Sequence, residues 1–422
     1  MTQFWTLPVP KSNLLLLGLT VFSLCFYLFV SLYAAPALIG KKHVDIVSEL
    51  YPGLKHLPRL QKEVYPLAYC YSEFSQGDCE EAEYVREKLR RRNHPVIRSW
   101  KKPLRIGVGT WTNEWLLEDI KNTNLASCPL PVQLVEAKQA LDRNFDVLVC
   151  ACSETSSISG VPAVLVNLEA FDHNFPDNVI LGSYSRQGDV WMTSWPASFQ
   201  CAEDDRLCLF PKPEKSHPKL GVEAFGAVFI SDCHDLFAHR RMRFVRELAL
   251  HIPLHSYGKC TIENTIPMDE HSVLESLLPD PSELLRLAKY ERKLMIMKQY
   301  NFSFVLENNI KYDYVTEKYF HGVLTGNVLV NFGAPNLNSL APFKYSAIDA
   351  LDFAHPKHLA EYLKFLRANE NFYEMMLLSN ISSRSNAVNP EYIQSYRHGF
   401  TSSLSGENSL LCRIAQYLNG KA

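Results

Sequence analysis

The sequence lacks a strong charge of either sign. Its 43 lysine and arginine residues nearly balance 45 aspartate and glutamate residues, so the formal net charge is −2. A chain without a basic excess has no electrostatic footprint for nucleic acid, and one without an acidic tail is not a charged, disordered solubiliser. Any positively charged binding site must therefore be local. The length of 422 residues allows roughly two or three domains.

Several signatures of metal and nucleotide chemistry are also missing. No Cys-x-x-Cys pair accompanies a second one, which argues against structural zinc. Gly107 and Gly109 lack the third glycine of a dinucleotide fingerprint, so we interpret them as part of a turn. No convincing Asp-x-Asp motif is present, because residues 203–205 read as an exposed acidic loop, and we predict no metal ligands. No repeat of solenoid period appears.

The cysteines and glycosylation sequons favour an oxidising lumen. One of the 11 cysteines, Cys25, lies in a long apolar run, which leaves an even number. Two pairs enclose short loops, as local disulfides do, although buried free thiols are the alternative. Cys150 and Cys152 alternate on one face of a predicted strand and are interpreted as packing residues. The short-loop pairs and the two predicted glycosylation sites are Cys70/Cys79, Cys201/Cys208, Asn301 and Asn380.

An uncharged apolar run occupies Leu14–Tyr33. At about 1.5 Å per residue its length matches a hydrocarbon core of about 30 Å. A cleaved signal peptide is the alternative, but its apolar region is normally only about 7–15 residues long. Flanking lysines do not fix the orientation. We therefore predict a cytosolic tail over residues 1–12, a transmembrane signal anchor over 13–34 and a stem over 35–102.

After the stem, short apolar runs of strand length alternate with helical patterns. The first three runs are 104–109, 145–151 and 161–168, and further runs begin at residues 225, 302 and 327. Such continuous runs are typical of parallel strands that are covered on both faces. Helical patterns at 236–251, 282–297 and 313–324 complete the alternation, and Asp235 and Asp313 are predicted to cap two of them.

This alternation predicts an α/β fold with right-handed crossovers. Two such units suggest two Rossmann-like domains that face each other across a cleft. We place the N-terminal domain at residues 103–222 and the C-terminal domain at 223–375. A helical stretch from about residue 356 is followed by polar, irregular sequence from residue 381, so residues 376–422 are interpreted as a helical and irregular tail.

The binding site is predicted at the end of the strand that begins at residue 302. Ligands in open α/β sheets bind beyond the carboxyl ends of the strands, where Glu307 and Asn308 lie. The N-terminus of the next helix favours a phosphate by roughly 0.3–2 kcal/mol. Lys318 adds a cation, Tyr314 a ring and a hydroxyl, and Glu317 an acceptor for sugar hydroxyls. Alternatively, Tyr314 is a core residue and the two charges form an exposed pair.

Three arginines begin the helix of another unit in the same domain, at residues 240, 241 and 243. A guanidinium fork suits a diphosphate, although a solvated helix face is the alternative. Together with Lys318 and the helix terminus, these residues indicate a site for a nucleoside diphosphate.

The motifs around this site resemble the α1,3/4-fucosyltransferase family, glycosyltransferase family 10. The similarity covers about residues 225–375, with a thinner match in the N-terminal half. The segments that carry it are Ala227–Cys233, Ser256–Cys260, Phe304–Asn308, Asp313–Lys318 and Gly333–Asn336, with Asn167–Glu169, Ser183–Arg186 and Asp189-Val190 in the thinner part.

The resemblance implies a GT-B fold and an inverting transfer of L-fucose from GDP-β-L-fucose to a sugar hydroxyl, which we expect to be the 3-OH of GlcNAc on a glycoprotein glycan. It implies donor contacts by Arg241, Asn308, Tyr314, Glu317 and Lys318, with Arg241 and Lys318 on the diphosphate. Glu169 matches the catalytic base, although the serine that follows it in the family is Ala170 here.

The resemblance also implies a location and a donor. The expected protein is a single-pass type II Golgi membrane protein, held in the bilayer through residues 13–34, with a luminal catalytic domain. GDP-fucose is the donor substrate, no cofactor is obligatory, and stimulation by Mn²⁺ is left open. Two alternative functions are a luminal GDP-sugar-binding pseudoenzyme and an enzyme that transfers fucose directly to protein hydroxyls.

Overall fold

The structure is a computed structural model. It describes residues 103–109, 120, 124–137, 145–150, 163–167, 179–185, 188, 190–193, 224–233, 236–343, 346–353, 355–384, 388–390, 392–393 and 409–419. Within these residues, no helix has both the length and the hydropathy to cross a lipid bilayer. The predicted tail, anchor and stem lie outside the described residues, as do the predicted cap Asp235 and the cysteine pairs Cys70/Cys79 and Cys201/Cys208.

Six described strands form the first sheet, all parallel, in the order β2-β1-β3-β4-β5-β6. Successive side chains of β4 pack into two different clusters: Val164 and Val166 on one face, Leu165 on the other. Both faces are covered, which explains the continuous apolar runs in the sequence. The strands are β1 (Leu104–Gly109), β2 (Val132–Ala137), β3 (Val147–Cys150), β4 (Ala163–Asn167), β5 (Val179–Ser183) and β6 (Val190–Trp191).

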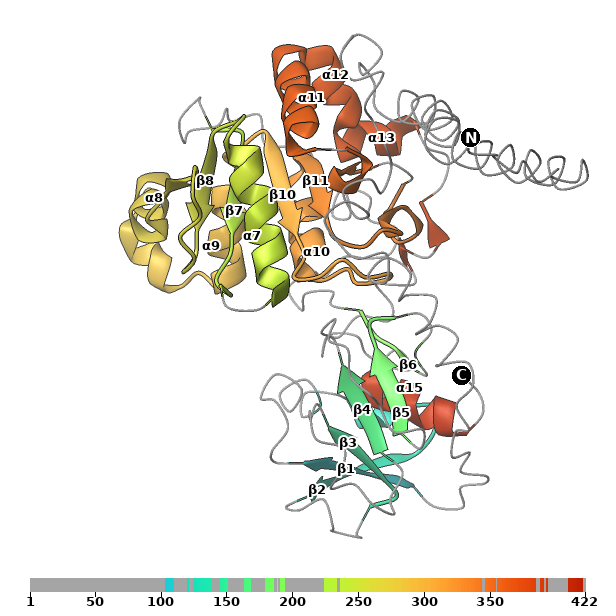
Figure 1. The fold of residues 1–422 in the computed structure, drawn as a ribbon. Coiled ribbons are helices and arrows are strands. Elements are labelled where there is room, and N and C mark those ends of the chain that lie inside the picture. Colours follow the sequence, from blue (N-terminus) through green and yellow to red (C-terminus); the bar gives the residue numbers. More distant parts are fainter. Residues whose placement is uncertain are drawn as a thin grey trace, which may run out of the picture.

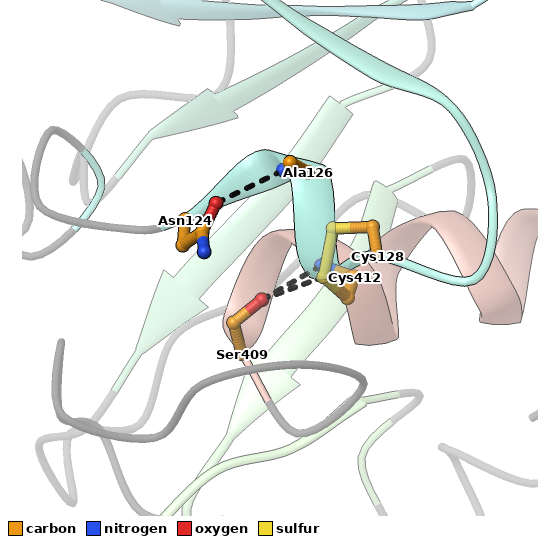
Figure 2. Close-up of a disulfide and its surroundings, with 5 residues drawn as sticks. All are labelled: Asn124, Ala126, Cys128, Ser409 and Cys412. Atoms are coloured by element: carbon orange, nitrogen blue, oxygen red, sulfur yellow. Dashed lines mark hydrogen bonds between the residues drawn. A yellow bond between two sulfur atoms is a disulfide. The ribbon is translucent and has the colours of Figure 1, made fainter.

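A helix from the C-terminal end of the chain covers one face of this first sheet (Figure 1). Helix α15 (Leu410–Leu418) begins at Ser409, whose Oγ accepts a hydrogen bond from Cys412 N at 3.4 Å (Figure 2). A disulfide joins Cys412 to Cys128, which follows the short 3₁₀ helix η4 (Leu125–Ser127). The expectation of irregular chain beyond residue 381 is therefore wrong here, because residues 410–418 bury an apolar stripe against this sheet.

The second sheet also contains six described parallel strands, in the order β12-β11-β10-β7-β8-β9. The chain moves one way from β7 to β8 and the opposite way from β10 to β11. This reversal places a topological switch point between β7 and β10, where open α/β sheets bind ligands. The strands are β7 (Gly226–Phe229), β8 (Leu254–Tyr257), β9 (Ile266–Pro267), β10 (Phe302–Leu306), β11 (Val328–Phe332) and β12 (Ile348–Asp349).

Helices cover both faces of the second sheet (Figure 1). Helices α7 and α11 pack on one face with Phe302 and Phe304, while α10 packs on the other with Val305. The described helices of this half are α7 (Leu236–Ala249), α8 (Glu270–Leu277), η5 (Pro281–Leu285), α9 (Lys289–Met297), α10 (Glu317–Thr325), η6 (Leu337–Ser339), η7 (Ala350–Asp352), α11 (Pro356–Ala368), α12 (Glu370–Met376) and α13 (Leu378–Arg384).

Two local predictions in this half are wrong. The single helix expected over 282–297 is η5 followed by α9, because Glu291 Oε2 accepts a hydrogen bond from Ala288 N at 2.7 Å and starts a new helix there. The polar stretch before residue 280 is not all loop, since Asp269 caps α8 by accepting from Ser272 N at 2.8 Å. The predicted α/β fold with parallel sheets is confirmed, and the predicted domain bounds stay predictions.

Candidate active site

The loop after β10 is closed at its base by one buried carboxylate. Glu307 follows the last residue of β10 and is 2% exposed. Its Oε1 accepts a hydrogen bond from Thr316 N at 2.8 Å, and its Oε2 accepts one from Thr316 Oγ1 at 2.6 Å. These two hydrogen bonds join the first and last residues of the β10–α10 loop, which we define as residues 307–316. A β-carbon on Gly333 would lie 2.7 Å from Glu307 Cγ, so glycine is needed there.

Thr316 also begins helix α10. Its Oγ1 accepts from Lys318 N at 3.4 Å, which caps the helix, while Gly326 ends it in the left-handed conformation at φ 72°. The prediction that Asp313 caps this helix is wrong, because Glu307 fixes Thr316 at the cap. Asp313 lies three residues earlier with φ 64°. Because Glu307 at the end of β10 holds Thr316, the N-terminus of α10 lies at the carboxyl end of β10, next to the switch point.

Arg241 reaches this edge from α7, the helix that follows β7. Its side chain is almost fully buried, and Nη1 donates to Leu306 O at 3.2 Å and to Asn308 Oδ1 at 2.6 Å. Its Nε is buried without a hydrogen-bond partner among the described residues. Burial lowers the pKa of Arg241, and the charges of Glu307 and Asp232 oppose that effect, so the guanidinium stays charged.

Two lysines face the N-terminus of α10. Lys318 Nζ lies 3.2 Å from Glu317 Oε1, 3.7 Å from Glu307 Oε2 and 3.1 Å from Thr316 Oγ1. Lys293, from the neighbouring helix α9, lies with its Nζ 5.6 Å from the centre of the Phe229 ring at the end of β7. Burial lowers the pKa of Lys293 to about 8, against the opposing charge of Glu317. Cations from three elements therefore surround the switch point.

The two glutamates respond to this environment in opposite ways. Burial raises the pKa of Glu307, and the charge of Lys318 only partly offsets it. Burial also acts to raise the pKa of Glu317, but Lys318 and Lys293 outweigh it and the pKa falls to about 2. Glu317 is therefore a carboxylate at any physiological pH, and its side chain is 45% exposed. It can accept hydrogen bonds from the hydroxyls of a sugar.

His321 lies one turn further along α10. Its ring stacks on that of Tyr290 from α9, with a centroid distance of 6.1 Å. Neither ring nitrogen has a hydrogen-bond partner among the described residues. Burial, followed by the charge of Lys293, lowers its pKa to about 4, so the ring is neutral at physiological pH. It adds no charge to the site.

The first sheet touches the same loop. The ring of Tyr184, just beyond β5, meets the ring of Tyr314 edge-on, with centroids 5.0 Å apart and planes at 70°. Tyr314 is fully buried. Beside this contact, Ser185 Oγ donates to Asp313 Oδ2 at 3.4 Å. The two halves of the chain therefore meet at the β10–α10 loop.

The predicted donor residues lie on the elements that surround the switch point. Arg241 and Asn308 are hydrogen-bonded to each other, and Glu317 and Lys318 form an ion pair at the start of α10. Tyr314 follows in the same loop, as a buried residue. The predicted base, Glu169, lies outside the described residues, two positions beyond the end of β4. The assignment of all these residues to donor binding or catalysis stays a prediction.

The two sequons stay predictions as well. Asn301 precedes β10, and its backbone carbonyl accepts a hydrogen bond from Tyr373 Oη at 2.5 Å. Asn380 lies in α13, and its Nδ2 donates to Glu374 O at 2.8 Å.

The described residues contain disulfides besides the two predicted pairs, which stay predictions. Cys233 pairs with Cys260, which ties together the segments that follow β7 and β8 beside the site. Cys150 is buried, as the packing interpretation holds, but it is also disulfide-bonded. The motifs Ala227–Cys233 and Ser256–Cys260 each end at one cysteine of the Cys233–Cys260 disulfide, so the sequence carried a signal for this pair. The described residues contain no group of three or more side chains suited to hold a metal ion.

Sequence reasoning missed the contribution of Lys293. It also missed the cap and carboxylate partner Thr316, and the contacts of Asp313. Lys293 lies on a helix that precedes β10, more than 20 positions from Lys318, and only the packing of α9 beside α10 brings its charge to Glu317. A lysine in an amphipathic helix carries no sequence signal for such a role.

Comparison with known proteins gives the same assignment as the motifs. Residues 223–378 match the sequence model described as glycosyltransferase family 10 (fucosyltransferase) C-term. A GDP-fucose protein O-fucosyltransferase 3 from Gallus gallus is 37% identical over 147 residues, which are 35% of this chain and 28% of that protein. An alpha-(1,3)-fucosyltransferase B from Drosophila melanogaster is 30% identical over 163 residues, 39% of this chain and 34% of that protein.

The similarity to these curated relatives spans about a third of their length. Among solved structures, an alpha1,3-fucosyltransferase with GDP-fucose aligns with 78% of this chain and 95% of its own, at 16% identity and a TM-score of 0.48. The predicted family resemblance is confirmed by the family model and the relatives. Residues 223–378 of this chain are thus similar to the C-terminal domain of the glycosyltransferase family 10 fucosyltransferases.

Proposed function

We propose that the chain is an inverting fucosyltransferase that moves L-fucose from GDP-β-L-fucose to a hydroxyl group. One observation carries the proposal: Arg241, Lys318 and Lys293 come from three helices to the switch point of the second sheet, where α10 also presents its N-terminus. Three cations and a helix dipole at one sheet edge suit the two phosphates of a nucleoside diphosphate.

The unmet hydrogen-bonding capacity of Arg241 supports this ligand. Its Nε is buried without a partner among the described residues, and a buried donor without an acceptor costs about 1–3 kcal/mol. A phosphate oxygen at this edge would supply an acceptor after a small shift of the guanidinium. As GDP leaves fucose C1, charge builds on the diphosphate, and cations already held in place stabilise that charge without reorganising.

Glu317 would recognise the sugar part of the donor. Because its pKa is about 2, it stays an acceptor throughout the physiological range. It is partly exposed and ion-paired, so a ribose or fucose hydroxyl can take one of its oxygens while Lys318 keeps the other. Asn308 and Tyr314 would position the donor from the β10–α10 loop.

The acceptor hydroxyl needs a base on the opposite face of fucose C1. We propose Glu169 for this role, with the two sheets forming a GT-B arrangement around the reaction cleft. Removal of the hydroxyl proton by such a carboxylate contributes roughly 10²–10⁴-fold to the rate. Fucose C1 develops oxocarbenium character as GDP departs, and attack from the opposite face inverts its configuration.

Two classes of acceptor are candidates for this reaction. The first is the 3-OH of GlcNAc on a glycoprotein glycan, which gives an α1,3 linkage, as the name of the Drosophila relative suggests. The second is a protein hydroxyl, because several relatives carry the name GDP-fucose protein O-fucosyltransferase 3. In either case we propose a type II Golgi membrane protein anchored through residues 13–34, with no obligatory metal and with Mn²⁺ stimulation as an optional effect.

The test is GDP release from GDP-fucose by the full-length chain in detergent, with glycans and folded glycoproteins offered separately and with Mn²⁺ or EDTA. Release that depends on a glycan, with fucose recovered on GlcNAc O3, supports the first acceptor. Release that depends on a protein stripped of glycans supports the second. Donor binding without acceptor-dependent GDP release would overturn the assignment as an enzyme and would instead support a GDP-sugar-binding pseudoenzyme.

A further inference from the structure

Asp313 is held by side chains from two distant segments. Within the second half of the chain, Asn336 Nδ2 donates to Asp313 Oδ1 and Asn336 Oδ1 accepts from Asp313 N, both at 2.8 Å. From the first half, Ser185 Oγ donates to the other carboxylate oxygen, Oδ2, at 3.4 Å. One carboxylate therefore bonds both halves of the molecule at once, in the middle of the β10–α10 loop.

The backbone of Asp313 needs this support. Its φ of 64° lies in the left-handed region, which aspartate and asparagine tolerate better than other non-glycine residues. The reciprocal pair with Asn336 fixes this conformation and directs the chain toward Tyr314 and the start of α10. Tyr314 then meets Tyr184, so two consecutive loop residues contact two consecutive residues that follow β5.

Ser185, which is hydrogen-bonded to Asp313, follows strand β5, and β5 pairs with β4, the strand that precedes the proposed base Glu169. Strands β4 and β5 are paired in parallel, and Asn167 is the register partner of Ser183. Ser185 is two residues beyond Ser183, and Glu169 is two residues beyond Asn167. A hydrogen bond from Ser185 to the β10–α10 loop therefore ties this end of the first sheet to the loop that precedes Glu317 and Lys318.

We propose that Asp313 is a positioning residue that sets the first half of the chain in register with the donor site, through Ser185 on one side and Asn336 on the other. The inference rests on the proposed function, because it assigns the two sides different kinetic roles. The Asn336 side shapes the donor loop and affects GDP binding. The Ser185 side aligns the two halves and affects transfer after the donor is bound.

Two alanine variants separate these roles. Ser185→Ala leaves the Asn336 pair intact, so we expect the Kd for GDP to stay within about twofold and kcat for GDP release to fall by about 2- to 12-fold, the equivalent of one hydrogen bond. Asn336→Ala removes both hydrogen bonds between Asn336 and Asp313, so we expect the Kd for GDP to rise by at least about 2- to 12-fold. The matched control is Ser276→Ala, which removes a serine hydroxyl bonded to Val273 O on α8.

Asp313→Gly separates the carboxylate from the backbone strain. Glycine adopts φ 64° without cost, so a purely conformational role predicts normal kinetics, whereas the positioning role predicts a loss of both GDP affinity and kcat. Hydrogen exchange gives a readout that does not depend on activity. The Asp313 amide donates to Asn336 Oδ1, so its exchange should accelerate in Asn336→Ala and stay slow in Ser185→Ala.

The experiment measures GDP binding by calorimetry, GDP release from GDP-fucose with the glycan or glycoprotein acceptors of the test above, and amide exchange over residues 310–316. The inference is supported if Ser185→Ala loses kcat with unchanged GDP binding, Asn336→Ala binds GDP more weakly, and Asp313→Gly shows both losses. It is overturned if Ser185→Ala matches Ser276→Ala, or if Asp313→Gly is kinetically normal. A wild type that does not bind GDP refutes the proposed function instead, and the exchange rates still decide whether Asn336 holds the loop.

Discussion

Replacing Thr316 with valine removes one hydroxyl from the base of the candidate site and keeps the shape of the side chain. That hydroxyl donates to Glu307 Oε2 at 2.6 Å and accepts from the backbone and ammonium nitrogens of Lys318. Thr316 is only 4% exposed, so water does not replace these bonds. Valine leaves the backbone N–H of residue 316 on Glu307 Oε1, which isolates the effect of the hydroxyl.

The magnitude follows from two losses. A missing N-cap costs about 1 kcal/mol, and a missing hydrogen bond to a buried carboxylate costs about 1.5–3 kcal/mol, so we expect a total of about 2.5–4 kcal/mol. For a domain of this size, each kcal/mol shifts Tm by about 2–4 °C, which gives a decrease of about 5–16 °C. Thr316→Ser keeps the hydroxyl and loses one methyl group, at a cost of about 1 kcal/mol, or about 2–4 °C.

The assay is thermal unfolding of the full-length chain, followed by fluorescence, with and without GDP. We expect the valine variant to melt well below the serine variant and to gain less from GDP, because Lys318 has lost its contact with Thr316. Equal melting temperatures for the two variants would mean that the hydroxyl does not hold the loop closed, and the account of Glu307 and Thr316 would then be incorrect.

Three further predictions concern charge, chemistry and packing. The Kd for GDP should rise by up to about tenfold between pH 7 and 9, because deprotonation of Lys293, whose pKa is about 8, removes a cation, and Lys293→Gln should flatten this profile in a calorimetric titration. The stability of the ligand-free protein should depend on pH in the opposite direction. Because the pKa of Lys293 in the folded protein, about 8, lies below its ordinary value of 10.5, the free energy of unfolding should rise with pH between these two values. Glu169→Gln should abolish turnover and leave the Kd for GDP unchanged, and a near-normal rate would require another base. Gly333→Ala should destabilise the protein by about 1–3 kcal/mol in thermal unfolding and weaken GDP binding, since its β-carbon would displace Glu307; a variant with wild-type Tm would contradict that contact.

The apolar runs predict several central strands but miss the central strand β5 and the edge strand β2. Strands β3, β4, β10 and β11 are covered on both faces and appear as continuous apolar sequence. Strand β2 lies at the edge of the first sheet, where Gln133 and Glu136 are exposed, so no such run marks it. Helix α15 was missed because the sheet residues it packs against lie far away along the chain, as does Cys128, its disulfide partner at a separation of 284 positions.

The candidate site shows a similar limit. Glu307, Glu317 and Lys318 could be found from sequence because they flank one strand end and one helix start. Asp313 and Thr316 are both good capping residues, and only the position of Glu307 at the end of β10 decides between them. The roles of Lys293 and Asn336 depend on the packing of α9 beside α10 and on the segment after β11, and no local pattern encodes those contacts.

The central claim is that Arg241 and Lys318 hold a guanosine diphosphate at the switch point of the second sheet. Isothermal calorimetry with GDP on the full-length wild type tests it most directly. We expect exothermic binding that weakens by about 10- to 150-fold in Arg241→Ala and in Lys318→Ala, the equivalent of one charged hydrogen bond of about 1.5–3 kcal/mol. Folded wild-type protein that gives no heat with GDP or GDP-fucose, or an Arg241→Ala, Lys318→Ala double variant that binds as tightly as the wild type, would contradict the account.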